Sequence, residues 1–167
     1  MRDEQVYFAN HAGLCVFKFV GELRHTSVEG MDGFIRHLFE QQHACSRVSV
    51  DLTETEYMDS TCLGLLAMLA RLSLSNSKGK PNLFCTNANM LLLLKSMCLD
   101  QVFHFVEERI EDIQMDELIT ESTTEPTADA QAELIYQAHK ELSALSEDNR
   151  KLFQPVVELM EKERQGN

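Results

Sequence analysis

A serine at an abrupt change of composition is the first residue whose position could carry chemistry. Ser60 follows the polar run "TETEYMD" and precedes a strongly apolar stretch with helical spacing. Serine and aspartate are preferred at helix N-caps, because their side-chain oxygens accept hydrogen bonds from free amides of the first turn. The same helix end carries partial positive charge and tolerates a phosphate. Asp59 and Ser60 are therefore candidate caps, and Ser60 is also a candidate phosphoacceptor.

A phosphate on Ser60 would alter a segment that is already acidic. Phosphorylation adds roughly −1.5 to −2 charges at neutral pH, close to Asp59, Glu54 and Glu56. Its main expected effect is repulsion and steric blocking at a surface that faces a partner. The same carboxylates, with Asp51, have the chemistry for acid–base or divalent-ion work in a dry, concave site. A Thr- and Glu-rich loop favours solvated side chains instead, so we predict no catalytic residue, metal or cofactor.

Common enzyme signatures are missing from the sequence. It contains no GxGxxG, Walker A, HExxH or GxSxG motif, and its six histidines are scattered singly. A hydrolase with Ser60 as nucleophile is the remote alternative, and it lacks an evident base or oxyanion motif. We therefore predict a protein that is not an enzyme.

The acidity of the chain limits its partners. The net charge is −12 over 167 residues, and residues 107 to 167 hold 16 acidic and 6 basic side chains. Phosphate backbones and anionic lipids would repel such a chain, so we predict protein partners, with no nucleic acid and no membrane. The start "MRDEQ" lacks the pattern of a signal peptide, and the five cysteines show no CxxC spacing. Both features favour a cytoplasmic protein with reduced thiols.

Strand and helix patterns alternate along the first two thirds of the chain. They predict a β-hairpin at residues 5 to 9 and 14 to 20, followed by an amphipathic helix at 28 to 39. A strand at 47 to 52 then leads into a polar loop and a largely buried helix from 61 to about 75. A short strand near 82 to 86, a further helix and a last strand at 101 to 106 complete the pattern. Short connections between such elements predict an α/β fold, a mixed sheet of about five strands with helices packed on it.

The C-terminal third has a different organisation. Residues 111 to 128 are acidic and rich in Ser, Thr and Pro, which predicts a linker. Residues 129 to 167 predict a helical extension, with positions from Ile135 to Leu159 in an a/d rhythm that marks one narrow contact seam. Ser146 and Pro155 interrupt it, so we expect two helices or one kinked helix. The extension either folds back on the domain, serves as an acidic solubilising tail, or docks on a second partner or a second copy through the seam and Asn149.

The stretch "VDLTETEYMDSTCLGLLAML" resembles the signature of STAS domains, the fold of bacterial anti-sigma factor antagonists. The likeness includes the Asp59-Ser60-Thr61 triplet and Leu63-Gly64 at the start of the apolar helix. "GELRHTS" and "LLLLKSMCLDQVFHF" extend it over residues 5 to 106, so the expected fold is STAS-like, with a STAS domain at 1 to 110. Cys62 stands where the family usually has glycine, and Arg24 where an acidic residue is common.

The resemblance implies a partner switch that controls transcription. In its unphosphorylated form the protein would bind an anti-sigma factor and release a sigma factor. A serine kinase would end this binding by phosphorylating Ser60, or less readily Thr61, and a phosphatase would restore it. The residues expected to contact the partner are Arg24, Glu54, Tyr57, Met58, Asp59, Ser60, Thr61 and Cys62.

A second function is open for the same fold. STAS domains also serve as accessory subunits of membrane transport complexes, where they support the cytoplasmic face of a transporter. The helical extension argues mildly against this alternative.

Overall fold

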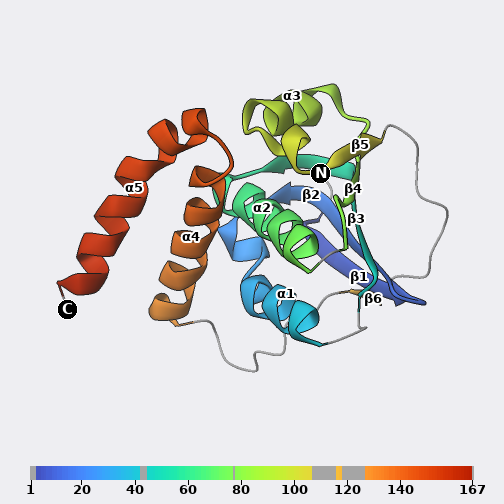
Figure 1. Cartoon of the computed structure of the whole chain (residues 1–167), viewed down its shortest axis with the longest axis horizontal. Helices are drawn as coiled ribbons and strands as arrows, with labels where there is room; N and C mark the ends of the chain where they lie inside the picture. Colours follow the sequence, from blue (N-terminus) through green and yellow to red (C-terminus); the bar gives the residue numbers. More distant parts are fainter. Residues whose placement is uncertain (1–2, 42–44, 77, 107–115, 118–126, 167) are drawn as a thin grey trace.

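A mixed β-sheet forms the centre of the computed structural model, which describes residues 3–41, 45–76, 78–106, 116–117 and 127–166. The strand order is β5-β4-β3-β2-β1-β6 (Figure 1). Strands β2 to β5 run parallel, whereas β1 is antiparallel to both β2 and β6. In chain order the strands are β1 (Gln5–His11), β2 (Leu14–Leu23), β3 (Arg47–Met58), β4 (Asn82–Phe84), β5 (His104–Val106) and β6 (Asp116–Glu117). The predicted fold class is confirmed, and the two-residue strand β6 lies inside the predicted linker.

The predicted hairpin is formed by β1 and β2. Two residues connect the strands, Ala12 with φ 52° and Gly13 with φ 90°. Positive φ at both central positions is the geometry that matches the twist of paired strands. The side chain of Asn10 accepts a hydrogen bond from the Gly13 amide at 3.1 Å, which supports the turn. The "NHAG" segment therefore turns as predicted.

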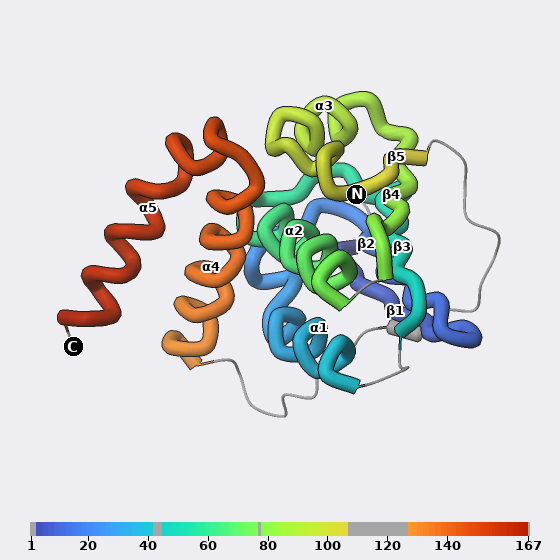
Figure 2. The backbone as a smooth tube through the Cα atoms, viewed as in Figure 1, coloured from blue at the N-terminus to red at the C-terminus, as the bar shows by residue number. Residues whose placement is uncertain are grey.

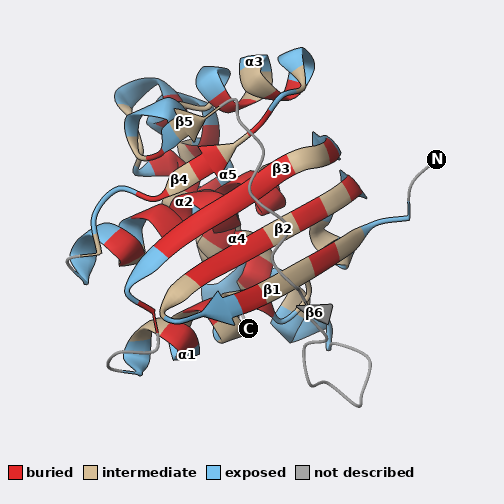
Figure 3. Cartoon of the chain, turned by 90° about the vertical axis from the view of Figure 1, so that its right-hand side faces the viewer, coloured by how far each residue is buried: buried red, intermediate tan, exposed pale blue. Residues whose placement is uncertain are grey.

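The helices lie mainly on one face of the sheet. Helices α1 and α2 cover this face, and α3 lies beside the β4–β5 edge (Figures 1 and 3). The first helix begins at Met31, later than predicted, after a short 3-10 turn. The bounds are η1 (His25–Ser27), α1 (Met31–Glu40), α2 (Ser60–Ser75), α3 (Ala88–Ser96), η2 (Leu99–Gln101), α4 (Ala128–Ser143) and α5 (Glu147–Gln165).

Helix α2 is the central element of the core. Every residue from 61 to 70 is buried, which confirms the prediction of a largely buried helix. Helix α2 is covered on two sides, because the sheet lies against one side and α4 against another (Figure 2). An amphipathic surface helix would have a polar stripe at these positions. The apolar composition of α2 thus reflects burial from both sides.

The C-terminal extension folds back on the domain as two helices. Ser146 caps α5 by accepting a hydrogen bond from the Asn149 amide, and Pro155 lies within α5 without ending it. Helix α4 packs on α2, and α5 packs on the outer side of α4 (Figure 1). Of the arrangements left open by the sequence, the structure has the folded-back one.

The predicted single seam along the extension is wrong. Ala138 and Leu142 of α4 are fully buried, whereas Leu152 and Leu159 of α5 are about 60% exposed. After the break between the helices, Phe153 and Val157 are the buried apolar residues of α5, in place of Leu152, Val156 and Leu159. Asn149 is buried and donates hydrogen bonds to the carbonyls of Met97 and Leu142. Its polar side chain therefore ties α5 to α3 and α4 within the chain.

Among the described residues, no helix combines the length and the apolar character needed to cross a membrane.

Candidate functional site

The polar run before Ser60 continues a strand, which corrects the loop predicted from residue 53 onward. Strand β3 extends to Met58 and pairs with β2 as far as Leu23. Thr55 is buried, and its hydroxyl donates a 2.7 Å hydrogen bond to the carbonyl of Phe19. Register shifts near Val20 and Glu22 mark local irregularities in the pairing. The sequence did not predict this part of the strand, because its residues alternate only weakly between apolar and polar. A polar side chain is accommodated there by a tertiary hydrogen bond.

Asp59 fixes the junction between β3 and α2. As the N-cap, its Oδ1 accepts a hydrogen bond from the Cys62 amide at 3.0 Å. Its Oδ2 accepts another from the His25 amide at 2.8 Å, and the Asp59 amide donates to the Leu23 carbonyl. The capping role predicted for Asp59 or Ser60 thus belongs to Asp59. The carboxylate of Asp59 therefore joins the start of α2 to η1, and its backbone amide joins it to the end of β2.

Ser60 is the first residue of α2, and its hydroxyl does not cap the helix. It is half-buried, and its Oγ lies 2.9 Å from Nε2 of His139 on α4. His139 Nδ1 lies 2.7 Å from the Ile135 carbonyl. Because a carbonyl can only accept, Nδ1 carries a proton, and in this tautomer Nε2 accepts. The Ser60 hydroxyl is therefore the donor to His139.

His139 is the functional candidate that the sequence did not identify. It is 79 residues from Ser60 in sequence, it is 7% exposed, and its ring packs edge-on against Phe153 of α5. Its only sequence signal is its place next to the apolar positions Ile135, Ala138 and Leu142. A histidine beside an apolar stripe indicates burial but names no partner.

The contact of a serine with an imidazole is also the first half of a nucleophile–base pair. Acyl transfer further needs amide donors for a developing oxyanion. The Cys62 amide in the first turn of α2 is already bonded to Asp59. The geometry around Ser60 thus favours a held hydroxyl over an activated nucleophile.

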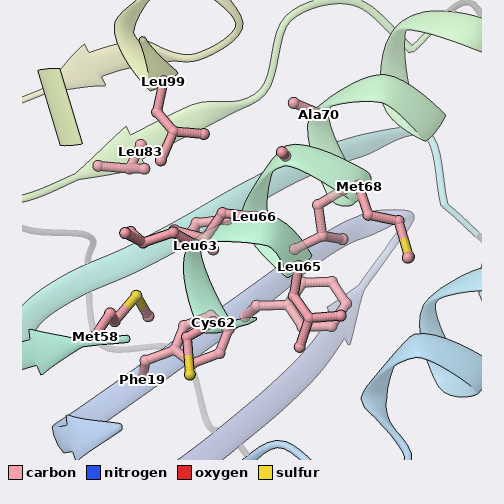
Figure 4. Packing of buried hydrophobic residues seen from close by; sticks show 14 of the residues in the cluster. Phe19, Met58, Cys62, Leu63, Leu65, Leu66, Met68, Ala70, Leu83 and Leu99 are labelled. Atoms are coloured by element: carbon pink, nitrogen blue, oxygen red, sulfur yellow. The ribbon is translucent and has the colours of Figure 1, made fainter. Parts of the chain in front are cut away.

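The residues after Ser60 point into the core. Thr61 is 4% exposed and Cys62 is 1% exposed, and Figure 4 shows Cys62 in one cluster with Phe19 and Met58. Burial raises the pKa of the Cys62 thiol, and the Asp59 carboxylate raises it further. The thiol is therefore neutral at physiological pH, and Cys62 fills core space between α2 and the sheet.

Replacing Cys62 with glycine is expected to lower the free energy of unfolding by about 2 kcal/mol. Loss of the buried side chain and the poor helix propensity of glycine each contribute about 1 kcal/mol. Urea unfolding measures the change. The matched control is Cys98→Gly, which is expected to be neutral or stabilising because Cys98 has φ 63°. Equal destabilisation by both variants would contradict the assigned place of Cys62.

The other residues predicted to contact a partner lie on β3 and directly after β2. Tyr57 is 44% exposed, and the guanidinium of Arg24 lies over its ring at 5.6 Å. Glu54 pairs with Lys18 of β2. Met58 is buried, with 1% exposure. The exposed pair of Arg24 and Tyr57 is thus the accessible part of the predicted partner surface near Asp59.

The acidic residues of this region do not converge on one point. Asp51 accepts hydrogen bonds from the amide and hydroxyl of Thr53, Glu54 pairs with Lys18, and Asp59 holds the helix start. Asp51, Glu54 and Asp59 thus each have a separate partner. Within the described ranges, no group of three potential ligands could hold a metal ion.

Comparison with known proteins gives a fold similarity. No family model and no curated protein matches the chain. The solved structure of the anti-sigma factor antagonist SpoIIAA in its unphosphorylated form matches with a TM-score of 0.50 and 20% identity, covering 64% of this chain and 90% of that one. The Bacillus cell fate determinant SpoIIAA in the phosphorylated form matches with a TM-score of 0.49 and 22% identity, covering 64% and 93%. The chain has a STAS-like α/β fold, similar to that of the anti-sigma factor antagonist SpoIIAA.

Proposed function

We propose that this protein is a cytoplasmic, non-enzymatic anti-sigma factor antagonist that acts as a partner switch controlled by phosphorylation of Ser60. The observation that carries the proposal is the place of Ser60, directly after β3 and at the first position of α2, in a fold similar to that of SpoIIAA. The partial positive charge at a helix N-terminus favours a phosphate. The unphosphorylated form would bind an anti-sigma factor and so release a sigma factor.

The expected chemistry of the switch is local. A phosphate on Ser60 would place its charge and bulk beside the Asp59 side chain and close to the exposed Tyr57 and Arg24. An acidic partner surface would be repelled, and any partner packed on the helix start would be blocked. Removal of the phosphate would restore the binding surface. A serine kinase and a serine phosphatase are the implied opposing enzymes.

Pull-down with quantitative mass spectrometry tests the switch. The baits are the native chain, Ser60→Ala, and a chain with phosphoserine installed at position 60 during translation. An anti-sigma factor should be retained by the first two baits and reduced at least tenfold on the third. Ser60→Glu should weaken binding less, since one carboxylate carries less charge and fewer acceptor oxygens than a phosphate.

Phosphosite mapping of the native chain from cells completes this experiment. Phosphate should be found on Ser60 in at least one growth condition and should disappear in Ser60→Ala. Retention of an anti-sigma factor by the phosphoserine bait, or its loss from Ser60→Ala, would contradict the proposal.

A further inference from the structure

The face of α2 that carries Ser60 is occupied by the C-terminal extension. Three contacts with α4 follow this face: Ser60 with His139, Gly64 with Ala138, and Arg71 with Glu141. Positions 60, 64 and 71 share one side of a helix with 3.6 residues per turn. Helix α4 therefore lies along the side of α2 on which the phosphate would be added.

The closest approach is at Gly64. A Cβ added there would lie 2.2 Å from the carbonyl oxygen of Ala138 and 2.7 Å from its Cα. Both atoms belong to backbone, so they cannot turn aside as a flexible side chain would. The two helices are thus in backbone contact one turn beyond Ser60, and α4 has no room to move inward.

The Ser60 hydroxyl is held beneath α4. Its proton is donated to His139 Nε2 at 2.9 Å, and His139 is itself fixed by the Ile135 carbonyl and by the ring of Phe153. A kinase needs this hydroxyl free, because its catalytic base accepts the same proton while the oxygen attacks ATP. In the docked arrangement the hydroxyl already has a partner, the buried imidazole of His139.

A phosphate on Ser60 would have to displace the contact with His139. It would replace the hydroxyl proton by a phosphorus and three further oxygens, where the next heavy atom is now 2.9 Å away. Room for the group requires α4 to move away from α2, which would break the close backbone contact between Gly64 and Ala138.

From these contacts we propose that α4 is an autoinhibitory cover of Ser60. While α4 is docked, Ser60 is protected from the kinase, and a phosphate on Ser60 expels α4 from α2. Helix α5 supports the docked state, because Phe153 and Val157 are buried on the extension and Asn149 bonds to the Met97 carbonyl of the domain. This inference rests on the proposed function in taking Ser60 as the phosphoacceptor, and it adds regulation by the chain's own extension.

Hydrogen–deuterium exchange on the full-length chain tests the exclusion directly. Phosphoserine is installed at position 60 during translation, so that no kinase has to be known. Peptides from residues 128 to 143 should exchange at least tenfold faster than in the unmodified chain. Peptides from β2 and β3 should keep their protection, which shows that the domain remains folded.

The matched control carries phosphoserine at Ser46, an exposed residue at the opposite end of β3. It receives the same charge away from α4, so exchange of residues 128 to 143 should remain as in the unmodified chain. Unchanged or slower exchange of α4 with phosphoserine at 60, or equal acceleration by both modifications, would overturn the proposal. Failure of the partner switch has a different signature, since it would leave Ser60 unmodified in cells or the anti-sigma factor bound.

Discussion

Replacing Gly64 with alanine is expected to detach α4 from α2 while the domain stays folded. The new Cβ would meet the Ala138 backbone at 2.2 Å, and all three of its nearest neighbouring atoms belong to Ala138. Alanine also raises helix propensity by about 1 kcal/mol relative to glycine. The substitution thus favours α2 itself and disfavours only the docking of α4.

Hydrogen–deuterium exchange should show at least tenfold faster exchange in residues 128 to 143 of Gly64→Ala, with β2 and β3 unchanged. Phosphopeptide measurements from cells should show a higher fraction of Ser60 phosphorylated, because the hydroxyl is uncovered. A partner that uses the same face should bind more tightly, since the population competent for binding increases.

Gly33→Ala provides the matched control for this substitution. Gly33 also lies inside a helix, α1, but a Cβ there would meet nothing within 4 Å. Gly33→Ala should stabilise the protein by about 0.5–1 kcal/mol and leave exchange of α4 unchanged. If Gly64→Ala behaves in the same way as Gly33→Ala, the close contact of α2 with α4 does not exist in solution.

Replacing Asp59 with alanine is expected to lower the free energy of unfolding by about 3 kcal/mol. Loss of a helix N-cap costs about 1 kcal/mol, and loss of a charge-assisted hydrogen bond to a backbone amide costs about 2 kcal/mol. The affected amides are those of Cys62 and His25, which are far apart in the chain. Urea unfolding followed by circular dichroism measures the sum.

The control for Asp59→Ala is Ser146→Ala, which removes the N-cap of α5 alone. It should cost about 1 kcal/mol, because its side chain caps one amide and joins no second segment. Equal losses for the two variants would show that the bond from Asp59 to His25 adds nothing to stability. The destabilisation by Asp59→Asn should lie between those of the other two variants, because an amide keeps one of the two acceptor oxygens and loses the charge.

The α/β fold was predictable because its signals are local. The hairpin follows from apolar strands around the "NHAG" turn, and α2 follows from an unbroken apolar helical pattern after a capping residue. The end of β3 was not predictable in the same way. Its last residues are polar, and Thr55 is accommodated only because its hydroxyl reaches the Phe19 carbonyl on a neighbouring strand. Local pattern cannot report a hydrogen bond supplied by another segment.

The candidate site shows the same difference between what local sequence determines and what tertiary contacts determine. The sequence determined that a serine would begin a buried helix beside an aspartate, because capping preference and apolar periodicity act over a few residues. Only the tertiary structure decided that Asp59 caps while Ser60 faces His139, and that Gly64 allows α4 to approach. These contacts depend on how α4 is rotated about its own axis, and its His139 lies 79 residues from Ser60 in the sequence. Packing of the whole chain sets this rotation. The break before α5, at Ser146, then allows α5 to pack on α4.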